Sequence, residues 1–147
     1  MEEVTAEEMM RHAPDASREM ASHLRVGVLS LPGVEEVSYG DPTEGAYFVA
    51  FSIDGDPVLQ AHMEDPLRVT LEVQETEARA LLGRPDLART EFLQVGKEER
   101  QPLGTLVESA TQEAEGGVSI DFVVASQEDL RAAVRLAHAK YDALMTG

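Results

Sequence analysis

The stretch "LPGVEEVSYGDPTEGAYFVAF", Leu31 to Phe51, decides the fold class that the sequence predicts. Pro32 and Gly33 end a helical pattern, because proline cannot continue a helix and glycine tolerates the backbone angles that follow one. Val34 to Ser38 and Ala46 to Ile53 are predicted strands, since both are rich in β-branched or aromatic residues and turn residues separate them. A helix that leads directly into strands indicates a fold in which both share one core.

The residues before this stretch predict two helices. Thr5 and Glu8 have the spacing of a capping box, in which a threonine hydroxyl and a glutamate carboxylate satisfy amides of the first turn. We therefore expect a short helix in an N-terminal extension, residues 1–14. Pro14 interrupts the pattern, and from Asp15 to Ser30 apolar residues recur at helical spacing, which predicts a long amphipathic helix.

The residues after Phe51 predict an antiparallel sheet. Asp54-Gly55-Asp56-Pro57 predicts a tight turn into a strand over Val58 to Met63, because an Asp-Gly pair tolerates positive φ. Arg68 to Val73 alternates polar and apolar residues, as expected of a strand with one buried face. Further on, we expect a helix over Glu75 to Leu82, a strand over Glu91 to Val95 and a closing helix from Ser126.

Residues 96–117 are predicted to be an insertion. Thr105 to Ala110 is expected to pair with Val118 to Ala125 as a hairpin, and a helix over Leu103 to Gln112 is the alternative. The order of all these elements predicts an α+β fold, an antiparallel sheet with the N-terminal and C-terminal helices packed on one face. A chain of 147 residues suits a single domain, residues 1–147, around one core.

Composition excludes several classes of protein. The chain has no cysteine, which excludes disulfides, thiolate metal sites and cysteine nucleophiles. No apolar run approaches the roughly 20 residues of a membrane helix, and the first residues lack the pattern of a secretion signal. We therefore expect a cytoplasmic protein that does not enter a membrane.

The net charge of −16, from 28 acidic and 12 basic residues, repels the phosphate backbones of nucleic acids. The least acidic stretch holds the five candidate nucleic-acid contacts, which are Arg79, Arg84, Arg89, Lys97 and Arg100. Asp86, Glu91, Glu98 and Glu99 lie among them, so the stretch is nearly neutral and nucleic-acid binding is not expected.

Several motifs together resemble a known family. "LSLPGVEEVSYGDPT" and "AYFVAF", then "LRVTLEVQETEARALLGRPDLARTEFLQVGK", "VSIDF" and "QEDLRAAVRLAHAKYDAL", are similar in order to the YjbR/MmcQ-like family over residues 23–145. The resemblance implies a CyaY-like α+β fold and the DNA binding that is often proposed for the family. Where the family has a basic segment that runs into a tryptophan, this chain has only Lys97 and Arg100 and no tryptophan, so that function is not expected to transfer.

Four aromatic residues form the candidate interaction surface: Tyr39, Tyr47, Phe48 and Phe51. Tyr47 and Phe48 point to opposite faces of a strand, so we expect one of them to be exposed. Apolar residues on both faces of Ala46 to Ile53 predict a homodimer or a protein partner that covers one face. The competing interpretation is that residues 96–117 fold back over this strand.

No catalytic constellation is predicted, and neither is a cofactor. His62 and Glu64 share one face of a predicted strand and could supply two metal ligands, whereas an ordered site needs three or four. We therefore expect only weak binding of divalent metals through acidic faces. No serine lies in a nucleophile elbow. The sequence thus predicts a non-enzymatic binding protein whose ligand it does not identify.

Overall fold

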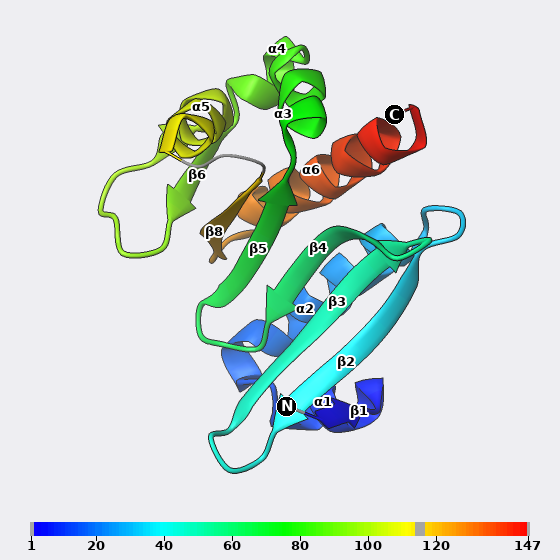
Figure 1. Cartoon of the computed structure of the whole chain (residues 1–147). Helices are drawn as coiled ribbons and strands as arrows, with labels where there is room; N and C mark the ends of the chain where they lie inside the picture. Colours follow the sequence, from blue (N-terminus) through cyan, green and yellow to red (C-terminus); the bar gives the residue numbers. More distant parts are fainter. Residues whose placement is uncertain (1, 114–116, 147) are drawn as a thin grey trace.

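The protein has two layers, a sheet of eight antiparallel strands and a layer of six helices, in the computed structural model that describes residues 2–113 and 117–146 (Figure 1). The strands are β1 (Glu2–Val4), β2 (Glu35–Asp41), β3 (Ala46–Ile53), β4 (Asp56–His62), β5 (Leu67–Val73), β6 (Glu91–Gln94), β7 (Gln101–Pro102) and β8 (Val118–Val124). The helices are α1 (Ala6–His12), α2 (Asp15–Leu29), α3 (Glu75–Leu82), α4 (Pro85–Ala88), α5 (Leu103–Glu113) and α6 (Gln127–Thr146). This architecture confirms the predicted α+β class.

The strands lie in the order β1-β2-β3-β4-β5-β8-β6-β7, and each neighbouring pair is antiparallel. The turn from β3 to β4 follows its predicted chemistry, because Asp54 and Gly55 have φ angles of 50° and 85°, as tight hairpin turns require. β8 then inserts between β5 and β6. Residues that are far apart in the chain therefore become neighbours in the middle of the sheet.

The helices cover one face of the sheet. In β3, Tyr47, Val49, Phe51 and Ile53 are buried, whereas the residues between them are half-exposed. Burial with a period of two residues is typical of a strand in a sheet with a single covered face. Figure 1 shows α2 behind β3 and β4, and α6 packs against β4 and β8. The opposite face carries no helix of the described chain.

A buried ion pair joins α6 to α3. Lys140, which is 1% exposed, donates hydrogen bonds to the Glu77 carboxylate and to the backbone carbonyl of Glu72 at the end of β5. Glu77 also accepts a hydrogen bond from the amide of Gln74 and so caps α3. Because an unpaired buried charge is costly, this pair favours a single placement of the closing helix.

The predicted cap of the closing helix is confirmed. The amide of Asp129 donates to Ser126 Oγ at 3.1 Å, and the Asp129 carboxylate accepts from the amide of Ala125 and from Arg100. Burial alone would raise the pKa of Asp129, but the hydrogen bonds from Arg100 and Ala125 outweigh it and hold this pKa below its usual range. Arg100 thereby ties the loop between β6 and β7 to α6.

The predicted hairpin between Thr105 to Ala110 and Val118 to Ala125 is wrong, and the alternative helix is correct. Leu103–Glu113 is α5, and β8 pairs with β5 and β6 instead. Leu103, Leu106 and Val107 are all buried, and their spacing of three and four residues is helical, not strand-like. α5 packs against α3, α4 and β8, so the described part of this segment does not cover the exposed side of β3.

The N-terminal extension contains a strand that the sequence analysis missed. Thr5 caps α1 as predicted, since the amide of Glu8 donates to its Oγ1 at 3.0 Å. Before it, Glu2–Val4 pairs with β2 and forms one edge of the sheet. Glutamate has a low strand propensity, so the position of these residues beside β2, and not their composition, determines this pairing.

Candidate functional site

The uncovered face of the sheet presents two rows of cross-strand neighbours. The pairing register places alternate residues of β2, β3, β4, β5 and β8 side by side on this face. The first row consists of Tyr39, Phe48, His62, Arg68 and Val123, and the second of Val37, Ala50, Gln60, Thr70 and Asp121. All of them are half-exposed except Thr70, which is 8% exposed. This surface, hereafter the open face, combines aromatic and polar groups.

The aromatic residues of the open face stack on one another. The ring centroids of Tyr39 and Phe48 lie 5.0 Å apart, and those of Phe48 and His62 lie 5.3 Å apart, with interplanar angles of 24° and 30°. Phe48 therefore has a ring on each side, and its π faces are not available to an incoming base. The row offers a half-exposed apolar ridge and not a flat stacking platform of the kind that single-stranded nucleic acids use.

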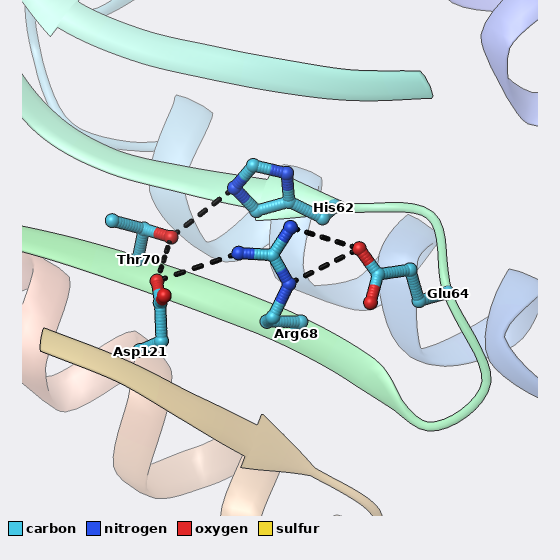
Figure 2. Close-up of polar contacts among 5 residues, drawn as sticks. All are labelled: His62, Glu64, Arg68, Thr70 and Asp121. Atoms are coloured by element: carbon cyan, nitrogen blue, oxygen red, sulfur yellow. Dashed lines mark hydrogen bonds and ion pairs between the residues drawn. The ribbon is translucent and has the colours of Figure 1, made fainter. Parts of the chain in front are cut away.

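Five polar side chains form a connected cluster beside this ridge, as Figure 2 shows. His62 Nε2 lies 3.1 Å from Thr70 Oγ1, and the Thr70 hydroxyl also contacts the Asp121 carboxylate. Arg68 donates from Nε and Nη2 to Glu64 at 3.1 and 2.9 Å, and its Nη1 lies 3.5 Å from Asp121 Oδ1. The cluster thus holds the Arg68 guanidinium between two carboxylates.

The hydrogen bonds of Thr70 place a proton on Nε2 of His62. The Thr70 hydroxyl has one proton, which it donates to the Asp121 carboxylate, so its oxygen accepts from Nε2–H of His62. Burial and the positive charge of Arg68 lower the pKa of His62, and Glu64 and Asp121 offset this only in part. A neutral imidazole that donates to Thr70 does not serve as its general base. The geometry favours a rigid recognition surface over nucleophilic catalysis.

Carboxylates outnumber cations on the open face. The strand carboxylates of this face include Glu3, Glu35, Asp41, Glu72 and Asp121. Arg68 is the one lysine or arginine among the described strand residues that point this way. The strands of the open face therefore carry more negative than positive charge.

The predicted nucleic-acid residues do not form a basic surface. Arg79 pairs with Glu75 at 2.6 Å, Arg84 with Asp142 at 2.8 Å and Arg100 with Asp129 at 2.6 Å. Within the described chain, Arg89 and Lys97 make no ion pair, and both are exposed. Most of the positive charge that could contact phosphates is already neutralised by the protein itself.

The four predicted interaction residues divide between the two faces of the sheet. Tyr39 and Phe48 lie on the open face, as the alternation of a strand allows. Tyr47 is 5% exposed and stacks on His12 of α1 with centroids 4.5 Å apart, and Phe51 is fully buried in the core. Tyr47 and Phe48 thus lie on opposite faces of β3 as expected, and Phe48, the less buried of the two, is half-exposed.

The predicted metal pair belongs to the polar cluster. His62 contacts Thr70 and Glu64 contacts Arg68, so each is engaged by a different partner. No group of three or more potential ligands is placed to hold a metal ion within residues 2–113 and 117–146. Sequence reasoning missed Arg68, Thr70 and Asp121 as site residues. The polar alternation in Arg68 to Val73 indicates that Arg68 and Thr70 share an exposed face, but the register with β8 is needed to add Asp121.

Comparison of the chain with protein-family models, with curated proteins and with solved structures gives no match. The resemblance to YjbR/MmcQ-like proteins therefore stays a prediction. Among the described residues, no helix has the length and apolar character needed to cross a bilayer.

Proposed function

We propose that the chain is a non-enzymatic binding module that docks a basic, partly apolar protein segment on the open face of its sheet. The observation that carries this proposal is the half-exposed ridge of Tyr39 and Phe48 next to a polar cluster whose side chains are already held in place. Aromatic residues and arginine dominate the binding energy of protein interfaces. Groups that are held before binding lose little conformational entropy on association.

The charge of the open face favours a basic partner over a second copy of the chain. A two-fold contact through this face would gather Glu3, Glu35, Asp41 and Glu72 of both copies at one interface. Like charges at an interface oppose association, whereas a lysine-rich or arginine-rich segment is complementary to them. The net charge of −16 adds long-range attraction for such a segment.

The proposal is tested with a short fluorescent peptide that alternates lysine and leucine, whose binding is followed by fluorescence anisotropy. Phe48→Ser is expected to weaken binding by about tenfold or more, because it removes the apolar centre of the interface. Val26→Ser is the matched control, since Val26 is 72% exposed on α2, away from the open face, and should change the affinity by less than about twofold.

Two further peptides separate charge from apolar contact. A peptide that alternates lysine and serine should bind more weakly, and one that alternates glutamate and leucine should not bind. Equal loss of affinity in Phe48→Ser and Val26→Ser would contradict the proposal. Light scattering at about 100 μM protein tests whether a second copy of the chain occupies the open face instead. A dimeric mass that becomes monomeric in Phe48→Ser would show that a second copy occupies the open face and would exclude the basic partner.

A further inference from the structure

A hollow in the helical layer, separate from the open face, is lined by the segment that joins α3 to α4 and by α6. Figure 1 shows where these three helices lie. Residues 83–87 line one side, and Val134, Arg135, His138 and Ala139 line the other. Its volume is about 630 Å³. This volume falls within the range of about 300–1,000 Å³ that is typical of small-molecule sites.

The floor of the hollow is apolar. Leu87 and Ala139 are 4% and 2% exposed, and Val134 is partly buried against the core. His138 adds a fixed wall, because its ring donates from Nε2 to the backbone carbonyl of Gly27 at 3.0 Å and so joins α6 to α2. These side chains suit the hydrocarbon part of a ligand.

Two arginines stand at the rim of this apolar floor. Arg84 is held by Asp142 at 2.8 Å, whereas Arg135 makes no ion pair or hydrogen bond with any residue that the structure describes. Arginine donates up to five hydrogen bonds in a planar fork that matches a carboxylate. In a chain with 28 acidic residues, an arginine without a carboxylate partner beside an apolar hollow has the chemistry of an anion contact.

We propose that this hollow binds a small organic acid, whose carboxylate pairs with Arg135 while its aliphatic or aromatic body rests on Leu87, Val134 and Ala139. Asp86, also at the rim, and the negative charge of the whole chain disfavour ligands with several phosphates. A single carboxylate with an apolar body satisfies both halves of the lining. This site is independent of the partner surface on the opposite face of the sheet.

The test uses 4-phenylbutyrate as the probe and 4-phenylbutanol as its uncharged counterpart, with binding followed through the amide NMR shifts of the full chain. The acid is expected to shift amides of residues 83, 84, 86 and 87 and of residues 134–139. Arg135→Gln should weaken its binding by about tenfold or more, because a charge-assisted pair is lost. Arg131→Gln is the matched control. Arg131 lies one turn earlier on α6, is exposed and does not line the hollow, so its replacement should change the affinity by less than about twofold.

Any of the following results would contradict the proposal. If the alcohol binds as tightly as the acid, the arginine does not recognise a carboxylate. If Arg131→Gln weakens binding as much as Arg135→Gln, only the general charge of α6 matters. Shifts elsewhere, or no shifts at millimolar acid, exclude the hollow as the site. Retained amide spectra of both variants show that lost affinity does not reflect unfolding.

Discussion

Replacement of Glu77 by leucine is expected to destabilise the protein strongly. The change leaves the Lys140 ammonium buried at 1% exposure with the Glu72 carbonyl as its remaining acceptor among the described residues. Removal of one partner of a buried ion pair costs about 3–5 kcal/mol. With an unfolding entropy of about 2.1 cal/mol/K per residue over 147 residues, the melting temperature should fall by about 10–16 °C.

The double variant Glu77→Leu/Lys140→Met shows how much of the lost stability comes from the interaction between these two side chains. Well-packed apolar residues often replace a buried ion pair at little cost, so the double variant should be more stable than Glu77→Leu alone. Both Lys140→Met and the double variant lose the donor to the Glu72 carbonyl, which costs about 1 kcal/mol and cancels in the double-mutant cycle.

Urea unfolding at pH 7, followed by circular dichroism, measures the four free energies. Glu75→Leu is the control on the same helix, because Glu75 is exposed in its pair with Arg79 and should contribute less than about 1 kcal/mol. The reasoning is refuted if Glu77→Leu costs no more than Glu75→Leu, or if the double variant loses the sum of the two single losses.

Four other predictions follow from particular residues. The NMR titration midpoint of His62 should lie below 6.5, because burial and the charge of Arg68 disfavour the protonated ring; a midpoint above 6.5 would show that Glu64 and Asp121 outweigh both. Stability should decline as the pH falls below about 6.5, because the unfolded chain takes up this proton first. Asp129→Asn should lower the free energy of unfolding by about 1–3 kcal/mol at pH 7. This difference from wild type should shrink as the pH falls through the lowered pKa of Asp129, and a difference that persists when Asp129 is fully protonated argues against the pair with Arg100. Tyr47→Asp should unfold the protein whereas Phe48→Asp should leave it folded, as circular dichroism can show, because only Tyr47 faces the core. Duplex DNA should not bind at physiological salt, and a salt-sensitive micromolar complex that Arg84→Glu with Arg89→Glu abolishes would overturn that view.

The local parts of the fold could be predicted from the sequence because their causes are local. Thr5 and Ser126 cap helices through side chains only three residues away from their partners, and Asp54-Gly55 defines a tight turn by its own backbone angles. The strand β1 is not predicted, and the helix α5 is predicted only as the alternative to a hairpin. β1 depends on pairing with β2, and α5 was ambiguous because its apolar run also suits a short strand.

The candidate site shows the same limit. His62 and Glu64 could be singled out because they lie two residues apart on a predicted strand, although β4 ends at His62 and Glu64 lies in the loop that follows. Thr70 and Asp121 lie 51 residues apart in the chain and meet only because β8 inserts beside β5. Likewise, the sequence places Tyr47 and Phe48 on opposite faces of β3 but does not say which face the helices cover. That information comes from the packing of α2 and α6.

The central claim is that the open face is a docking surface for a basic segment. Its most direct test is a map of the amide NMR shifts during titration with the peptide that alternates lysine and leucine. The account predicts that the shifted amides concentrate in β2, β3, β4 and β5, around Tyr39, Phe48, His62 and Arg68, while those of α2 and α6 stay in place. Shifts spread over the acidic residues of both layers, or centred on the helices, would contradict it.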